Sequence, residues 1–188
     1  MRLFIAIELS DELRNHLVEM QDRVRTLAPN LSFTRPHNLH LTLKFLGEVP
    51  DADVKGITDA LAGIQPVGEF PFTTSGIVCF PECGRVRVVS ADVEPPARLT
   101  QLQHLIDAAM EAKGFPRVRR PFHPHVTLAR ARTPLPAPVR KRLSAPDSAP
   151  DASTSMPAND FVLMQSRLHP KGAQYSPVAR FYIKLPQL

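Results

Sequence analysis

The order of predicted elements favours an α+β protein with a duplicated, two-lobed fold. Predicted strands and helices alternate along the chain, a hairpin closes it, and each half contains a motif strand that follows a helix. That motif is His-x-Thr-x, which occurs at residues 40–43 and again at residues 125–128. The 188 residues are 43% hydrophobic, which allows one sizeable core. We therefore predict a single two-lobed domain over residues 1–188.

The chain begins with a strand pattern and continues with a helix pattern. Residues 3–9 form a short apolar run that suits a buried strand. Ser10 can then cap a helix, with Asp11 and Glu12 in its first turn, where acidic side chains are favourable. Apolar residues follow at helical spacing, and we expect this stripe to pack in the core: Leu13, Leu17, Met20, Val24 and Leu27.

The first motif lies in a predicted strand over residues 39–46. A short extended piece at 32–35 and the break at Pro36 precede this strand. Successive side chains of a strand point to opposite faces. The apolar positions should therefore share one face: Leu39, Leu41, Leu43 and Phe45. The polar positions should share the opposite face: His40, Thr42 and Lys44.

The middle of the chain predicts two helices with two strands between them. Asp51 can cap the first of these helices, which carries apolar residues at helical spacing. Residues 70–80 and 85–93 are typical of two strands joined by a turn. A further helix is expected over residues 96–113, and Gly114 can end it.

The second motif is expected in a strand over residues 122–130. Residues 134–157 are rich in Pro, Ala, Ser and Asp, so we predict a surface loop there with a short helix at 139–143. Strands at residues 161–169 and 178–185 should then form the final hairpin. The expected total is three or four helices and seven or eight strands.

The two motif strands suggest a site for acid–base chemistry. His40 and Thr42 should share one strand face, and so should His125 and Thr127. If the two strands lie side by side, two imidazoles and two hydroxyl donors converge on one spot. This set suits a small anion, and phosphate is the natural candidate. Either histidine taken alone would more often be structural, so the pairing is what favours catalysis.

Composition limits the partners and the location. The net charge of +5 favours an anionic partner and permits RNA, although no long basic run occurs. Cys79 and Cys83 lack the second ligand pair of a structural zinc site, so we expect reduced thiols. The apolar run at 3–7 is too short for a signal peptide, and no stretch approaches the roughly 20 residues that span a bilayer. We expect a cytoplasmic protein without membrane contact.

Three segments carry a resemblance to a known family: residues 2–8, 38–47 and 122–130. Their sequences are RLFIAIE, NLHLTLKFLG and FHPHVTLAR. They resemble the RNA 2′,3′-cyclic phosphodiesterases of the two-histidine phosphoesterase superfamily, also called 2′-5′ RNA ligases. The terminal hairpin is similar to that family's ending as well, so the likeness covers nearly the whole chain.

The resemblance implies a bilobal fold in which two antiparallel sheets face a central cleft, with helices on the outside. It implies hydrolysis of RNA 2′,3′-cyclic phosphate ends to 2′-phosphomonoesters without a metal or cofactor, and the same chemistry can also run as reversible 2′-5′ RNA ligation in vitro. His40 is the implied proton donor and His125 the implied proton acceptor. Thr42, Thr127 and Arg130 match residues that bind the phosphate. We expect a monomer that acts on such RNA ends or on a related nucleotide.

Several residues near the motifs keep alternative interpretations. Strand parity places Arg130 opposite His125 unless the strand twists or ends there. Lys44 can bind phosphate, but a strand lysine is more often a solvated charge. His123 departs from the family pattern, and together with His125 it could bind zinc, although no matching ligands are nearby in sequence.

Aromatic and basic side chains could extend the site. Phe4, Phe45 and Tyr175 could stack a base, although core packing is the commoner role for phenylalanine. The densest basic cluster, which could steer an RNA backbone or be a solvated loop, is Arg117, Arg119 and Arg120. The rival activities are hydrolysis of 2′-5′-linked oligonucleotides or small cyclic nucleotides, and ligand binding by the same fold without turnover.

Overall fold

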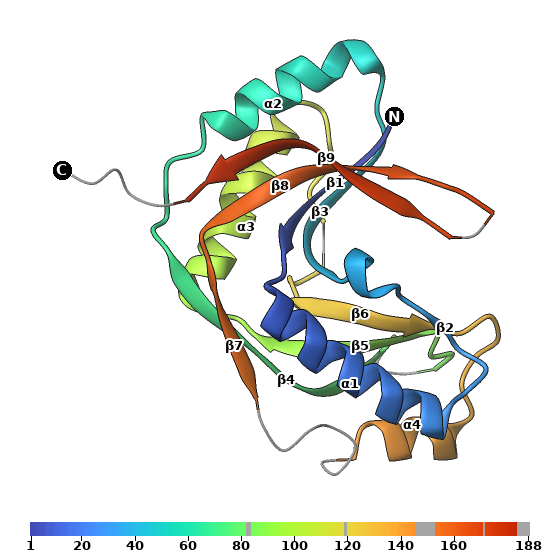
Figure 1. Ribbon diagram of the computed structural model, residues 1–188. Coiled ribbons are helices and arrows are strands. Elements are labelled where there is room, and N and C mark those ends of the chain that lie inside the picture. The colour runs from blue at the N-terminus through green and yellow to red at the C-terminus, as the bar shows by residue number, and fades with distance from the viewer. Residues whose placement is uncertain (82–83, 119, 146–152, 171, 184–188) are drawn as a thin grey trace.

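A curled antiparallel sheet forms the centre of the protein, and helices cover its outer side (Figure 1). The computed structural model describes residues 1–81, 84–118, 120–145, 153–170 and 172–183. Within these residues the strands are β1 (Arg2–Glu8), β2 (Ser32–Phe33), β3 (His40–Glu48), β4 (Phe70–Phe80), β5 (Val88–Glu94), β6 (His125–Arg130), β7 (Thr154–Ala158), β8 (Asp160–Arg167) and β9 (Gln174–Tyr182). The α-helices are α1 (Asp11–Leu27), α2 (Val54–Ala62), α3 (Ala97–Glu111) and α4 (Ala137–Leu143). The predicted α+β class is confirmed.

The strand order is mirrored about the two motif strands. The sheet runs β7-β4-β5-β6-β3-β1-β8-β9, and all its pairs are antiparallel, while β2 adds to β6 from outside this path. The two motif strands are therefore neighbours at the centre, with β1 beside β3 and β5 beside β6. Only the pair Leu41 and Val126 joins them. The two predicted sheets are thus two half-sheets that meet at a single residue pair.

The helices interlock the two halves of the chain. Helix α1 leaves β1, yet it packs against β6 and β7 of the other half-sheet, and α4 lies beside it (Figure 1). Helix α3 leaves β5 and packs against β3, while α2 contacts β9 and α3. Helix α1 therefore follows a strand of one half-sheet and packs against the other half-sheet, and α3 does the reverse. One continuous core contains buried residues of both, among them Ile5, Leu41, Val126 and Phe161.

The first helix forms as its sequence predicts. The Ser10 hydroxyl accepts a hydrogen bond from the Leu13 amide at 3.2 Å, which satisfies one free backbone donor of the first turn. The expected stripe is buried at Leu13, Leu17, Met20 and Val24.

The prediction that Asp51 caps the second helix was wrong. Residues 51–53 form a 3₁₀ turn, and helix α2 begins after this turn without a side-chain cap.

Two strand predictions need correction. The predicted loop at 134–157 contains strand β7, which is possible despite Pro157 because β7 lies at the edge of the sheet and needs few backbone donors. Strand β6 begins at His125 rather than at residue 122. The expected short helix at 139–143 is present as α4. Predictions for Cys83, Arg119 and residues 146–152 lie outside the described residues.

Candidate active site

Both motif strands contain the same irregularity at the fourth motif position. In β3, Thr42 and Lys44 pair with consecutive residues of β1, so Leu43 is an extra residue. In β6, the extra residue is Leu128, because the residues on either side of it pair with consecutive positions of β5. A bulge of this kind reverses which face the following side chains occupy. The two strands accordingly share one burial pattern over their first six residues.

The bulges correct the side-chain faces expected from strict alternation. Phe45 was expected in the core, but it is 66% exposed and lines the same cleft as His40. Arg130 occupies the equivalent position of β6 and lines that cleft with His125, although parity alone placed it on the other face. Lys44 turns inward and is only 3% exposed. The extra residue at the fourth motif position thus brings the Arg130 guanidinium into the cleft and buries the Lys44 side chain.

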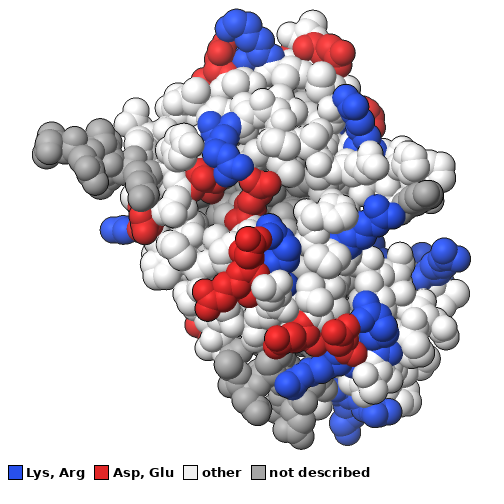
Figure 2. All heavy atoms as spheres, in the orientation of Figure 1, with Lys and Arg blue, Asp and Glu red and all other residues white. Residues whose placement is uncertain are grey.

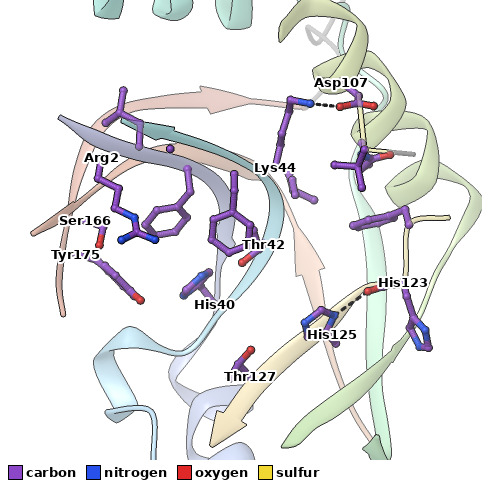
Figure 3. A pocket seen from close by; sticks show the side chains of 18 of the residues that line it. Arg2, His40, Thr42, Lys44, Asp107, His123, His125, Thr127, Ser166 and Tyr175 are labelled. Atoms are coloured by element: carbon purple, nitrogen blue, oxygen red, sulfur yellow. Dashed lines mark hydrogen bonds and ion pairs between the residues drawn. The ribbon is translucent and has the colours of Figure 1, made fainter. Parts of the chain in front are cut away.

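A cleft of about 910 Å³ lies between the two half-sheets. All five side chains predicted from the sequence line it: His40, Thr42, His125, Thr127 and Arg130. Figure 3 shows His40 and Thr42 on one side, with Tyr175, and His125 and Thr127 on the strand that faces them. The arrangement brings two imidazoles and two hydroxyls from neighbouring strands to one space, which suits an anion with several oxygen atoms.

The two imidazole rings are held in the same way. The Nδ1 atom of His40 lies 2.7 Å from the carbonyl oxygen of Asn38, and Nδ1 of His125 lies 2.8 Å from that of His123. Because a carbonyl only accepts hydrogen bonds, Nδ1 must carry the proton in both rings. The Nε2 atom of each neutral ring is then an acceptor. Each histidine can therefore exchange a proton through Nε2 without changing its orientation.

Both histidines lose part of their basicity in the folded protein. Burial lowers the pKa of His40, the hydrogen bond to the Asn38 carbonyl opposes this effect, and the charges of Arg130 and His125 lower it further. Burial also lowers the pKa of His125, against its bond to the His123 carbonyl, and Arg130 again adds to the lowering. Arg130 is thus close enough to both rings to disfavour their protonation.

Replacement of Arg130 should raise the pKa of both histidines. The Arg130→Gln change removes a positive charge that lowers both pKa values, so each imidazole should take up its proton at higher pH. Titration of the ring C–H signals by NMR measures this directly. His16, on helix α1 and outside the cleft, provides an internal reference. An unchanged titration of His40 and His125 would contradict the electrostatic role of Arg130.

Aromatic rings pack against both histidines. The Phe4 ring lies 4.9 Å from the His40 ring and 5.0 Å from the Tyr175 ring, between ring centres. Phe80 lies 4.6 Å from His125. Phe4 is also buried in a small cluster on the inner face of the sheet, so its expected packing role is confirmed. These contacts fix the planes of the imidazoles and remove water from one side of each ring.

The other basic residues near the cleft are partly neutralised. Lys44 was expected to be a phosphate ligand or a solvated charge, and both interpretations were wrong. Its ammonium group forms a buried ion pair with Asp107 of α3 and donates to the Pro116 carbonyl at 2.9 Å (Figure 3). Arg117 pairs with Glu111 at 2.7 Å. Of the predicted basic cluster, Arg120 also lines the cleft.

A zinc site at His123 and His125 finds no support in the described part of the chain. There, no group of three or more histidine, cysteine or acidic side chains could hold a metal. The Nε2 atom of His123 instead lies 3.1 Å from an Asp92 carboxylate oxygen.

No described helix is long and apolar enough to cross a membrane.

Sequence reasoning did not find Asn38, Arg2 and Ser166, all of which line the cleft. Asn38 supplies the carbonyl that orients His40, and its side-chain amide donates to the Ala173 carbonyl at 2.7 Å. Its position two residues before the motif histidine is shared by His123, which supplies the equivalent carbonyl. That spacing was the available signal. Arg2 and Ser166 carry no such signal, because only the pairing of β1 with β8 brings them together.

A mirrored α+β sheet with a histidine and a threonine from each central strand facing one cleft defines a two-histidine phosphoesterase. The model of the LigT-like phosphoesterase family matches the chain twice, over residues 7–90 and 89–175. The chain belongs to this family. Its two consecutive matches divide the chain into halves with one motif strand each, which agrees with the duplication inferred from the element order.

Similar proteins support the same assignment over nearly the full length. An RNA 2′,3′-cyclic phosphodiesterase of Methanothermobacter thermautotrophicus is 31% identical, covering 96% of this chain and 97% of the relative. A protein of the same name from Thermus thermophilus is 34% identical, with 98% and 91% covered. A solved structure of a Thermus thermophilus protein has a TM-score of 0.81 at 32% identity and full coverage of both chains. Escherichia coli LigT complexed with 3′-AMP has a TM-score of 0.78 at 28% identity, with 98% of each chain covered.

Proposed function

We propose that this protein hydrolyses RNA 2′,3′-cyclic phosphodiester ends to 2′-phosphomonoesters, using two imidazoles and no metal ion. The observation that carries the proposal is the matched pair of histidines, each with Nδ1 bound to a carbonyl and Nε2 left for proton exchange. Relatives that match nearly the whole chain bear the name RNA 2′,3′-cyclic phosphodiesterase. Proton transfer at two positions of one reaction is the task that such a pair can perform.

The reaction needs one proton acceptor and one proton donor on opposite sides of phosphorus. His125 accepts a proton from water as the water oxygen attacks phosphorus. The bond from phosphorus to the 3′ oxygen breaks, and protonated His40 gives its proton to that oxygen. The products are a 2′-phosphomonoester and a free 3′-hydroxyl, with one water consumed. The two histidines have then exchanged protonation states, and proton exchange with solvent restores the starting form.

The remaining cleft residues stabilise charge on the phosphate. Thr42 and Thr127 each sit two positions after a histidine, and their hydroxyls can donate to the non-bridging oxygens. Arg130 adds a positive charge, and its attraction to the phosphate becomes stronger as negative charge accumulates in the transition state. A phosphate anion in the cleft also favours the protonated form of an imidazole. It thereby offsets the lowering of the pKa that burial and Arg130 impose on His40.

The test uses an RNA oligonucleotide that ends in a 2′,3′-cyclic phosphate, with EDTA present. We expect turnover, a mass gain of one water, and a product whose phosphate is removed by phosphatase and located at the 2′ oxygen by NMR. A 3′-phosphate product would contradict the assigned direction of bond cleavage. Turnover that stops with EDTA and returns with an added divalent ion would overturn the metal-independent mechanism.

The same pair of histidines permits 2′-5′ RNA ligation as a second reaction. If a 5′-hydroxyl of another RNA replaces water as the attacking group, His125 accepts its proton and a 2′-5′ phosphodiester forms. Escape of the 3′ oxygen requires the same proton from His40. Because both reactions pass through one site, a variant that loses hydrolysis should lose ligation with it. Hydrolysis of 2′-5′-linked oligonucleotides is the reverse of this ligation, followed by opening of the cyclic phosphate.

We propose that the protein acts as a single-domain monomer in the cytoplasm. The cleft contains residues of both halves of one chain, so a second copy is not needed to complete it. The helices that cross between the half-sheets support a single domain. Light scattering at the concentrations used for assays distinguishes a monomer from a dimer. The expected cytoplasmic location rests on the RNA substrate and on the small number of cysteines.

A further inference from the structure

Arg2 and Ser166 form the polar end of the cleft beyond His40. Strand β1 pairs Arg2 with Ser166 of β8, and β8 pairs Ser166 with Tyr175 of β9. All three side chains line the cleft. Figure 3 shows them together with His40 on one side of the cleft, opposite His123 and His125. A guanidinium, a serine hydroxyl and a phenol thus lie near one another at a distance from the motif of β6.

The charge of Arg2 is available for a ligand. Among the described residues, Arg2 has no ion-pair or hydrogen-bond partner for its side chain, and it is exposed. Lys44 and Arg117 line the same cleft, but acidic side chains neutralise both. Glu48 is the backbone partner of Arg2 on β3 and does not line the cleft. Arg120 and Arg130 also line the cleft, but they come from β6 and from the segment that precedes it. Arg2 is the arginine that β1 contributes to the cleft.

The face of the molecule shown in Figure 2 offers a less suitable path for a nucleic acid backbone. On the face shown in Figure 2, acidic and basic side chains are interspersed, without a continuous basic area. Binding of a phosphate chain needs positive charge along the path of the backbone. A guanidinium that lines the cleft attracts a phosphate more strongly than one on such a mixed surface, because the cleft walls exclude part of the solvent.

The assigned chemistry determines which side of the cleft holds the ribose. In an in-line displacement, the attacking water and the departing 3′ oxygen lie on opposite sides of phosphorus. His125 takes the proton of the water, and His40 gives a proton to the 3′ oxygen. The ribose that carries this oxygen must therefore lie on the His40 side. Its 5′ oxygen, and the RNA chain attached to it, continue along that same side of the cleft.

An apolar wall connects His40 with Arg2. Phe4 and Tyr175 both contact the His40 ring, at 4.9 and 5.3 Å between ring centres. Phe45, which is 66% exposed, lies 6.1 Å from Phe4 by the same measure. Phe4 is buried, so Phe45 and Tyr175 are the rings of this wall that can accept the face of a base, and they do so without reading its sequence. The cleft volume of about 910 Å³ is near the upper end of small-molecule sites, which leaves room beyond the terminal nucleotide.

We propose that Arg2 and Ser166 bind the phosphodiester on the 5′ side of the terminal nucleotide. This inference rests on the hydrolytic function proposed above, because that function places the ribose beside His40. The guanidinium can contact two phosphate oxygens, and the serine hydroxyl can donate to one. The protein then distinguishes an RNA end from a free cyclic nucleotide. It does so through a phosphate that does not react.

The test compares three substrates: adenosine 2′,3′-cyclic phosphate, the same nucleotide with a 5′-monophosphate, and the dinucleotide ApA with a terminal 2′,3′-cyclic phosphate. Wild-type protein should have a higher kcat/KM for the dinucleotide than for the cyclic mononucleotide. Arg2→Gln should lower kcat/KM for the dinucleotide about tenfold to a hundredfold, the usual value of a charge-assisted contact, and leave the cyclic mononucleotide unchanged. Arg2→Lys should restore part of the loss. Arg167→Gln, on the same sheet but outside the cleft, is the matched control.

Three outcomes would overturn the subsite. The first is an equal wild-type kcat/KM for the dinucleotide and the cyclic mononucleotide. The second is a loss of kcat/KM in Arg2→Gln that is the same for both substrates. The third is a wild-type kcat/KM that rises above that of the cyclic mononucleotide only for the substrate with a 5′-monophosphate. Failure of the proposed function looks different, since wild-type protein would then turn over none of the three substrates. Calorimetry with adenosine 2′-monophosphate and its ApA dinucleotide counterpart still decides the subsite in that case. Only the dinucleotide should bind more weakly to Arg2→Gln.

Discussion

His40→Ala and His125→Ala should each lower kcat on a cyclic phosphate end by about a hundredfold to ten-thousandfold, while His16→Ala leaves it unchanged. Each change removes one of the two proton-transfer groups and leaves the phosphate ligands in place. KM should therefore change much less than kcat. His16 lies on α1 outside the cleft, so it controls for the loss of an imidazole from the surface. Steady-state kinetics on one defined oligonucleotide supplies kcat and KM for the wild-type protein and the three variants.

The pH dependence separates the two histidines. The base must be neutral and the acid protonated, so kcat/KM for wild-type protein should follow a bell-shaped curve whose two apparent pKa values belong to the pair. The pKa of each ring is lowered in the free protein, so the optimum of kcat/KM should lie on the acidic side of the usual histidine range. The optimum of kcat should lie at higher pH, since bound phosphate favours protonated imidazole.

Residual activity of the variants assigns the roles. His125→Ala lacks the base and should lose the rise of activity on the acidic side, whereas His40→Ala lacks the acid and should lose the fall on the alkaline side. A substrate with sulfur in place of the 3′ oxygen provides an independent check, because a thiolate departs without a proton. It should restore much of the activity of His40→Ala and little of that of His125→Ala. The opposite pattern would exchange the two roles, and equal restoration would contradict the mechanism.

The sequence predicts the motif strands well, because the relevant information is local. Alternation and the repeated His-x-Thr-x spacing identify β3 and β6, and the structure makes them neighbours through Leu41 and Val126. Helix α1 follows from the stripe and from Ser10, whose cap is a contact over three residues. These features depend on residues close in sequence, so a single chain is enough to find them.

The bulges are not visible in the sequence, because a bulge is a property of two paired strands. Nothing in the LTLKF segment indicates that β1 will skip Leu43, and the expected faces of Lys44 and Phe45 were therefore wrong. The same event in β6 carries Arg130 into the cleft, where strand parity alone excluded it. The subsite at Arg2 and Ser166 was missed for a related reason, since residues 164 positions apart meet only through sheet pairing.

Lys44→Met should lower the free energy of unfolding by about 3 kcal/mol, the lower end of the cost of breaking a buried ion pair. The Lys44 side chain is 1% exposed and that of Asp107 is 12% exposed, so little water can replace the lost partner. The change also removes the donor to the Pro116 carbonyl. The shift of the urea unfolding midpoint measures the effect, provided that the dependence of the unfolding free energy on urea concentration is unchanged. Lys55→Met breaks an exposed pair on α2 and should change stability by no more than about 0.5 kcal/mol.

The double variant Lys44→Met with Asp107→Leu tests whether the cost comes from the charge left behind. Apolar residues of similar volume can replace a buried pair with little loss, so the double variant should be more stable than either single variant. The pair links the residue after the β3 bulge to helix α3, which covers that half-sheet. If it fixes the bulge, the double variant should regain stability but keep a lowered kcat, because Thr42 and Phe45 flank Lys44 on the cleft face. Full recovery of both quantities would show that packing alone maintains the bulge.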